Sequence, residues 1–175
     1  RKFPDPVLRQ KARRVRDMDK SLQKLIDDMF ETLQHEYGVG LAAPQVGISL
    51  RLCVIQLPET LEKFVLVNPE VVKRKGIRLV DEGCLSIPGY KGEVNRSESI
   101  VVKYWDREGK STRLKGEDLL AQALEHEIDH LNGVLYLDRL ESPEKLQRIE
   151  PDEKSSSVAS APESEKEPVE SICGK

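Results

Sequence analysis

Hydrophobic side chains recur at three- and four-residue steps in two stretches of the chain, which is the spacing of an amphipathic helix. The first stretch runs from Ser21 to Gly38 and the second from Glu117 to Asn132. Ser21 is the predicted N-cap of the first helix and Gly38 its predicted stop. In the second helix, Glu117 suits the positive N-terminal end and Gly133 the C-terminal stop.

Four short apolar runs between the two helices have the length and the β-branched composition of strands. They cover residues 52–55, 64–67, 77–80 and 100–105. Turn-forming residues separate them: Pro58, Asn68-Pro69, Lys75-Gly76, Pro88-Gly89 and Glu108-Gly109. Short turns favour antiparallel pairing. The order predicts an α+β fold in which antiparallel β-sheets pack around the second helix, with the first helix on the N-terminal side.

Composition divides the chain near residue 149. Residues 150–175 contain seven acidic residues, three lysines, six serines and three prolines. Such a segment buries too little apolar surface to offset the entropy lost on ordering, so we expect a disordered acidic tail. Subtracting its charge of -4 from the total of -3 leaves about +1 on residues 1–149, which we predict to form one near-neutral globular domain.

Several classes of protein are excluded by composition. No window has the roughly 18 to 20 uninterrupted apolar residues of a membrane span, so we expect no membrane partner. The start, Arg1 to Pro4, lacks the apolar core of a signal peptide, which favours the cytoplasm; a trimmed start keeps an organelle as the alternative. Cys53, Cys84 and Cys173 are too few and too scattered for a disulfide framework. With 25 Lys and Arg against 24 Asp and Glu in residues 1–149, no direct nucleic-acid binding is predicted.

The sharpest chemical signal is the run His126-Glu127-Ile128-Asp129-His130 on the second predicted helix. The four-residue spacing places both imidazoles on one face, where two nitrogens can bind one metal ion. Glu127 lies about 100° round the helix and can reach a metal-bound water without being a ligand. The competing interpretation is a chance pair on an amphipathic helix. Because the chain has only three histidines, the spacing favours the metal site.

A catalytic metal takes three protein ligands and keeps one open position, so a third ligand is needed. The pattern His-x-x-Gly-x-x-His begins at His130 but fails, because Tyr136 occupies the ligand position. Cys84 is the better candidate: Gly83 and Pro88 mark an irregular segment around it that can approach a metal closely. A thiolate with two imidazoles suits zinc or iron. A lone cysteine is otherwise more often a core residue, as we expect for Cys53.

Gly38 to Gly47 is too rich in small residues for a helix and is predicted to be a loop. It is not a phosphate loop, because no Gly-Lys-Ser/Thr follows. Within it, Gln45 offers a side-chain N–H that can stabilise an oxyanion.

Three segments together resemble the sequence motifs of the peptide deformylase family in order and spacing. They are Gly38 to Gln45, Glu82 to Ser86 and His126 to His130. The resemblance extends from about Pro4 to Glu150. It implies an enzyme that removes the N-terminal formyl group from formyl-methionyl nascent peptides and releases formate.

The resemblance also implies a set of roles. The implied ligands of one Fe²⁺, with Zn²⁺, Ni²⁺ or Co²⁺ as substitutes, are Cys84, His126 and His130. Glu127 would take a proton from a metal-bound water and pass it to the leaving amine. Gln45 and the backbone N–H of Leu85 would stabilise the oxyanion. Glu82 and Arg96 would form an ion pair that supports the Cys84 segment.

Substrate contacts carry over in the same way. Residues expected to pair with the peptide backbone are Val39, Gly40 and Gly83. Residues expected to line the methionine pocket are Val80, Leu119, Gln122, Ala123 and His126. The implied partners are formyl-Met nascent peptides and, transiently, the ribosome. Some bacterial relatives dock there through a long basic C-terminal helix, whereas here we expect Ser142-Pro143-Glu144 to start at most a short helix.

Two other functions compete with this interpretation. A metal-stabilised binding module without turnover needs a fourth protein ligand that closes the metal site. No Cys or His in a suitable sequence context supplies that ligand. A general zinc peptidase needs a third ligand of the usual type, which the sequence lacks.

Overall fold

The computed structural model describes residues 1–149, so the predicted acidic tail at 150–175 lies outside the described residues. The α-helices are α1 (Lys20–His35) and α2 (Asp118–Leu131). Short 3-10 segments lie at Pro6–Arg9, Ala43–Val46, Tyr136–Arg139 and Pro143–Lys145. The strands are β1 (Gly40–Ala42), β2 (Leu52–Gln56), β3 (Lys63–Lys75), β4 (Arg78–Cys84), β5 (Ile87–Arg96), β6 (Ser99–Trp105), β7 (Ser111–Glu117) and β8 (Leu146–Arg148).

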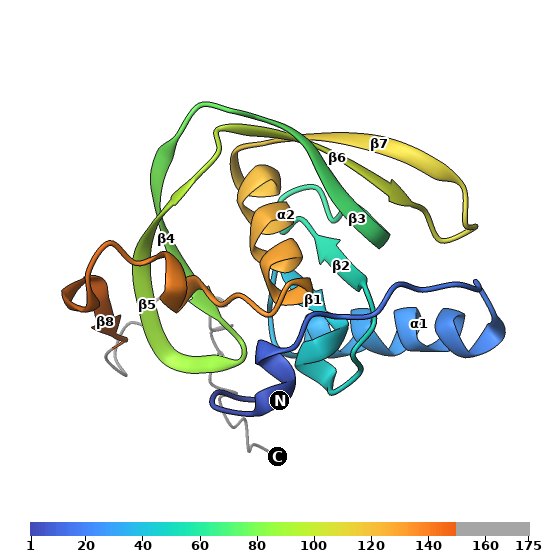
Figure 1. Ribbon diagram of the computed structural model, residues 1–175, viewed down its shortest axis with the longest axis horizontal. Coiled ribbons are helices and arrows are strands. Elements are labelled where there is room, and N and C mark those ends of the chain that lie inside the picture. Colours follow the sequence, from blue (N-terminus) through green and yellow to red (C-terminus); the bar gives the residue numbers. More distant parts are fainter. Residues whose placement is uncertain (150–175) are drawn as a thin grey trace, which may run out of the picture.

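Within the described chain the strands form two sheets. One has the order β1-β2-β3-β6-β7 and the other the order β4-β5-β8, and every strand pairing is antiparallel. Figure 1 shows α2 in the middle of the molecule, with β4 and β5 on one side and the five-stranded sheet on the other. The predicted α+β fold with antiparallel sheets around the second helix is confirmed.

Three apolar clusters hold these layers together. In the first, Leu124, Ile128 and Leu131 of α2 pack on the five-stranded sheet. In the second, one face of α1 packs on β1 and β2. The third joins the N-terminal segment, β5 and the segment after α2 through Leu8, Ile87, Val94, Leu135 and Tyr136. Burying each Leu- or Ile-sized side chain stabilises the fold by about 1.5–3 kcal/mol, so α2 is fixed firmly against the sheet.

The ends of α1 differ from the prediction. Asp19 is the N-cap, because its side chain accepts a hydrogen bond from the backbone N–H of Leu22 at 2.8 Å; Ser21 lies inside the helix. At the other end, Tyr37 and not Gly38 takes the left-handed conformation, with φ 53°. Gly38 follows it and donates its N–H to the carbonyl five residues earlier at 3.0 Å. This is a Schellman motif with a non-glycine residue at its centre.

The strand predictions were incomplete. The four apolar runs fall within or overlap β2, β3, β4 and β6, whereas β1, β5, β7 and β8 were missed. The segment from Gly38 to Gly47, predicted to be a loop, contains β1 and a 3-10 turn. Asn68-Pro69, predicted to be a turn, lies inside β3 where the register shifts. The Asn68 side chain satisfies both backbone groups of Val15 at 2.9 Å, which stabilises this irregularity.

Gly133, which ends α2, provides a test of this packing. It has φ 74°, and a Cβ there would lie 2.5 Å from the carbonyl oxygen of Arg9. Gly89 also has a positive φ, 81°, but a Cβ there meets nothing within 4 Å. We expect Gly89→Ala to lower the free energy of unfolding by about 1–2 kcal/mol, and Gly133→Ala by about 2 kcal/mol more, because the backbone contact adds to the conformational strain. Urea unfolding measures both; equal losses contradict the predicted contact.

Candidate active site

Three potential metal ligands converge between α2 and the end of β4. One ligand atom from each of Cys84, His126 and His130 lies within 4.8 Å of the others. The Sγ of Cys84 is 3.2 Å from Nε2 of His130, and the two imidazoles stand edge to face with centroids 4.9 Å apart. In residues 1–149 this group has three members, which matches the donor set of a catalytic zinc or iron site with one open position.

The β4–β5 hairpin places Cys84 at this point. Cys84 pairs with Ile87 across a tight turn, and the register shifts between Gly83 and Cys84. The segment predicted to be irregular is therefore the turn of a hairpin whose strand β4 ends at the thiol.

Gln45 binds this turn from the other side. Its Nε2 donates to Oγ of Ser86 at 3.2 Å and lies 3.5 Å from Sγ of Cys84. Its Oε1 accepts the backbone N–H of Ala42 at 2.8 Å. The amide is thereby oriented with its N–H groups toward the ligand group.

A buried network of charges supports the ligands. Arg96 donates from Nε to Oε1 of Glu82 at 2.7 Å, from Nη2 to Oε2 at 2.9 Å, and from Nη1 to Asp129 at 2.7 Å. Both Glu82 and Arg96 are 3% exposed, so the predicted ion pair is confirmed and is buried. Glu82 also contacts Nδ1 of His126 at 2.8 Å. With Nδ1 donating to a carboxylate, Nε2 is the ring nitrogen that remains for a metal.

These contacts shift the titration of the site. Burial alone raises the pKa of Glu82, but the hydrogen bonds from Arg96 and His126 outweigh it and hold that pKa at about 2. Burial lowers the pKa of His126, yet its hydrogen bonds with Cys84 and Glu82 raise it well above the usual value. Burial, together with the neighbouring His126, lowers the pKa of His130 well below its usual value. The lowered pKa keeps the His130 imidazole neutral, and the neutral imidazole is the form that binds a metal.

Glu127 differs from the other buried carboxylates of the site. It is 3% exposed, and its Oε2 has no hydrogen-bond partner in the described part of the chain. Burial raises its pKa to about 7, and the nearby Glu82 and Asp129 carboxylates act in the same direction. Gly40 makes room for it, because a Cβ at that position would lie 2.3 Å from Oε1 of Glu127. No signal in the sequence indicated this contact.

A cavity of about 570 Å³ opens onto this group. The predicted residues that line it are Val39, Gly40, Gln45, Gly83, Cys84, Leu85, Leu119, Gln122, Ala123, His126 and Glu127. Val80 packs against the third apolar cluster, and its contact with a methionine side chain stays a prediction. Lining residues that were not predicted include Asp81, Ile87, Pro88, Tyr90 and Ile149.

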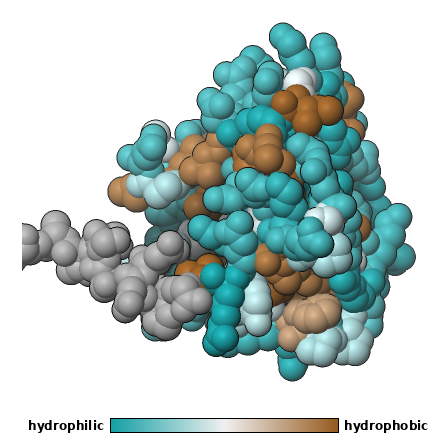
Figure 2. Space-filling view, turned by 90° about the vertical axis from the view of Figure 1, so that its left-hand side faces the viewer, coloured by the Kyte–Doolittle hydropathy of each residue, from teal (hydrophilic) through white to brown (hydrophobic). Residues whose placement is uncertain are grey.

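The surface around β4 and β5 is partly apolar. Figure 2 shows apolar side chains interrupting a hydrophilic surface on this side of the molecule. Leu79 of β4 is 50% exposed and Tyr90 of β5 is 41% exposed, as is Leu119 at the start of α2 with 39%. Tyr90 and Leu119 also line the cavity, so its rim offers contacts to apolar side chains of a ligand.

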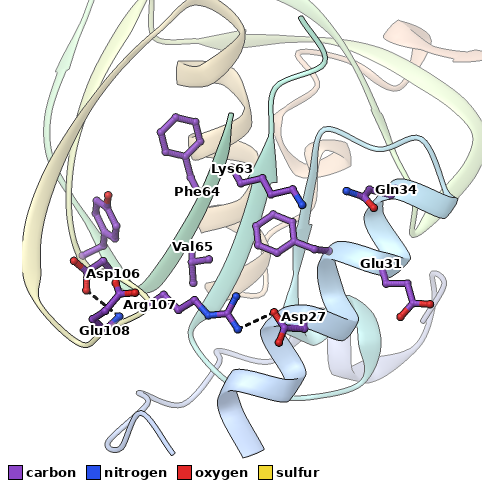
Figure 3. Close-up of a pocket in the computed structure, with 11 residues that line it drawn as sticks. Asp27, Glu31, Gln34, Lys63, Phe64, Val65, Asp106, Arg107 and Glu108 are labelled. Atoms are coloured by element: carbon purple, nitrogen blue, oxygen red, sulfur yellow. Dashed lines mark hydrogen bonds and ion pairs between the residues drawn. The ribbon is translucent and has the colours of Figure 1, made fainter. Parts of the chain in front are cut away.

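A second cavity, of about 540 Å³, lies between α1 and β3 and is shown in Figure 3. Inside it, Asp27 and Arg107 form an ion pair at 2.7 Å, and Nζ of Lys63 lies 5.0 Å from the centre of the Phe30 ring. Of its charged lining residues, Asp27 and Arg107 pair with each other, and the lining contains neither histidine nor cysteine. The chemistry belongs to the cavity beside α2.

Comparison with known proteins identifies the family. The model of the polypeptide deformylase family matches residues 1–146. The chain belongs to this family. A peptide deformylase of Dehalococcoides mccartyi strain CBDB1 is 56% identical over 151 residues, which cover 86% of this chain and 90% of that protein. One of Heliobacterium modesticaldum is 50% identical and covers 81% and 92%.

Solved structures agree with this assignment. A peptide deformylase from Legionella pneumophila superimposes with a TM-score of 0.79 at 51% identity, over 82% of this chain and 85% of that one. A peptide deformylase from Synechococcus elongatus, in complex with actinonin, has a TM-score of 0.79 at 45% identity, over 82% and 79%.

The chain is therefore an enzyme, a metal-dependent deformylase that removes the N-terminal formyl group from nascent peptides. The cluster of Cys84, His126 and His130 fits the metal dependence of the family. In the described part of the chain, neither helix is long and apolar enough to cross a membrane.

The buried Glu82 makes the stability of the metal-free deformylase depend on pH. Its pKa of about 2 in the folded protein lies below the ordinary 4.5, so it stabilises the fold above pH 4.5, and this contribution disappears as the pH falls through 2. We expect Glu82→Gln to be less stable than the parent at pH 7, with a difference that shrinks by about 3 kcal/mol between about pH 4.5 and pH 2. Urea unfolding of both proteins over this range measures the difference.

The exposed Glu59 provides the matched control. Glu59→Gln should change the free energy of unfolding little at any pH. A difference between Glu82→Gln and the parent that stays constant from pH 7 to pH 2 contradicts the assigned role of Glu82.

Proposed function

We propose that this deformylase works with one ferrous ion, held by Cys84, His126 and His130, and that Glu127 moves the proton of the reaction. The donor set supports the proposal, because a thiolate and two imidazoles bind Fe²⁺ and equally accept Zn²⁺, Ni²⁺ or Co²⁺. An ion held there would lower the pKa of a coordinated water toward neutrality and would polarise the formyl carbonyl.

The observation that carries the proposal is the buried Oε2 of Glu127, which has no hydrogen-bond partner within residues 1–149 and lies beside the three proposed ligands. A carboxyl with a pKa of about 7 can both accept and release a proton near neutral pH. Glu127 takes one proton from the attacking water as the new C–O bond forms. It delivers that proton to the nitrogen of the peptide as the C–N bond breaks. The products are formate and a free N-terminal amine.

Two donors are assigned to the negative charge that develops on the formyl oxygen. Gln45 is held by Ala42 and Ser86, so its amide needs little reorganisation during the reaction. The backbone N–H of Leu85, in the turn after Cys84, is the second donor. Both residues line the cavity.

The substrate backbone is proposed to lie between two sheet edges. β1 and β4 are outer strands of their sheets, and Val39, Gly40 and Gly83 line the cavity between them. An extended peptide can add to such edges through main-chain hydrogen bonds. A Cβ at Gly83 would meet only the carbonyl oxygen of Tyr90, at 3.6 Å, so the edge at this position is open to a ligand.

The methionine side chain is assigned to the part of the cavity beside α2. Leu119, Ala123 and His126 line it, and Val80 of β4 stays part of the proposed pocket. Gln122 donates from Nε2 to the carbonyl oxygen of Asp81 at 3.0 Å, which ties this polar side chain to β4. Because the substrate is a nascent chain, we place the enzyme where translation occurs, in the cytoplasm or in a translating organelle.

Substitution of Glu127 tests the mechanism. We expect Glu127→Gln to lower kcat for a formyl-Met peptide by about 10²–10⁴-fold, because an amide cannot carry the proton, while about one metal ion per chain remains bound. Formate release and metal analysis of the same sample measure the two quantities.

Glu125 provides a matched control on the same helix. It is buried like Glu127, but its oxygens are engaged by Arg74 at 2.7 Å and by the backbone N–H of Ser97 at 2.8 Å. Folded Glu125→Gln should keep kcat within a few-fold. If Glu127→Gln retains its activity, or loses it only together with the metal, Glu127 is not the proton carrier.

A further inference from the structure

The outer edge of β4 forms one wall of the catalytic cavity, and a side chain of α2 closes this edge at one point. Asp81, Glu82 and Gly83 of β4 line the cavity, and so does Gln122 of α2. Nε2 of Gln122 donates a hydrogen bond to the backbone carbonyl oxygen of Asp81 at 3.0 Å. A main-chain acceptor of an outer strand is thus already bound by the enzyme itself.

The main-chain groups of Gly83 point to the same edge. In an antiparallel pair, the N–H and C=O of one residue point to the same side of the strand, and this side alternates from residue to residue. β4 and β5 keep one register from Arg78 to Gly83, so the alternation is unbroken there. The Asp81 carbonyl is directed to α2, outside the pair of strands. Gly83, two residues further on, therefore presents both of its main-chain groups to the cavity.

A substrate on this edge meets Gln122 after a few residues. The formyl oxygen is assigned to the N–H of Leu85, so a peptide antiparallel to β4 has its second residue beside Gly83 and its fourth beside Asp81. The second residue can exchange two main-chain hydrogen bonds with Gly83. The N–H of the fourth residue would need the Asp81 carbonyl, where the amide of Gln122 already lies.

Attachment of β4 to α2 is already provided by other contacts. Inside the protein, Glu82 of β4 contacts Nδ1 of His126 at 2.8 Å. Glu82 is 3% exposed, whereas Gln122 is half-buried. Further along β4 from the proposed metal ligands, Nη2 of Arg78 donates to the carbonyl oxygen of Asp118 at the start of α2. The bond from Gln122 is therefore not needed to hold the strand and the helix together.

We propose that Gln122 determines how much of the substrate is bound through its main chain, because it ends the pairing of the peptide with β4 at Asp81. The second residue of the peptide pairs with Gly83, and the chain leaves β4 before its fourth residue. Deformylation then does not depend on main-chain bonds from the fourth residue onward. This suits an enzyme whose nascent substrates differ in sequence after the methionine. The inference rests on the proposed function, since it needs the formyl group at the ligand trio.

Formyl-Met pentapeptides in which one peptide N–H is replaced by an ester oxygen test the proposal. One peptide has the ester before its second residue, another has it before its fourth, and a third is all amide. Formate release by the metal-loaded full chain gives kcat/KM for each. In the parent enzyme we expect the ester before the second residue to lower kcat/KM about three- to tenfold, because a hydrogen bond to Gly83 is lost, and the ester before the fourth residue to change it less than about 1.5-fold.

Substitution of Gln122 should extend the pairing. In Gln122→Ala the Asp81 carbonyl is free, so the ester before the fourth residue should lower kcat/KM about threefold or more relative to the all-amide peptide, whatever the absolute activity of the variant. Gln23→Ala is the matched control. Gln23 is half-buried on α1, and its Nε2 donates to the carbonyl oxygen of Arg107 at 3.0 Å. This variant should respond to the three peptides as the parent does.

Two results overturn the role of Gln122 alone. One is a loss of about threefold or more in the parent from the ester before the fourth residue, which shows that pairing continues past Asp81 and needs no variant that folds. The other is no loss from that ester in Gln122→Ala. If the ester before the second residue costs the parent nothing, the pairing with Gly83 and the role of Gln122 both fail. Absence of formate release from the all-amide peptide contradicts the catalytic assignment itself.

Discussion

The buried carboxylate of Glu82 is the interaction on which the site depends. It lies at the end of β4 and binds two groups from other elements, the Arg96 guanidinium of β5 and the His126 imidazole of α2. Arg96 extends the connection to Asp129 on the same helix. A buried carboxylate without such partners would cost several kcal/mol, so the hairpin and the helix have one favourable relative position. That position brings the thiol of Cys84 to the two imidazoles.

The remaining features of the site follow from placing a helix at the centre of the molecule. One side of α2 is apolar and packs on the five-stranded sheet, so its other side can hold His126 and Glu127 at the cavity, with His130 buried near them. Gly40 of β1 allows the approach of the Glu127 carboxylate. The same burial that leaves one carboxylate oxygen unpaired raises its pKa to about 7, which suits a proton carrier. The packing that buries Glu127 is thus also the cause of its raised pKa.

Local signals made the helices, the four apolar strands and the ligand trio predictable. The periodicity of apolar residues indicated α1 and α2. On any helix, the four-residue spacing of His126 and His130 places both imidazoles on one face. β7 was missed because most of its outward residues are charged and few of its inward residues are apolar, so the alternation typical of a strand is weak. The contact between Gly40 and Glu127 depends on how β1 is placed against α2, which short-range patterns do not specify.

The most direct test of the ligand trio is titration of the metal-free enzyme with Co²⁺, read by the charge-transfer absorption of a cobalt-bound thiolate. The account predicts saturation at one equivalent, loss of the band in Cys84→Ser, and an unchanged band in Cys53→Ala. Cys53 is fully buried in β2, and burial raises the pKa of its thiol well above the usual value, so it should contribute nothing. A band that survives in Cys84→Ser, or disappears in a folded Cys53→Ala protein, would contradict the assignment.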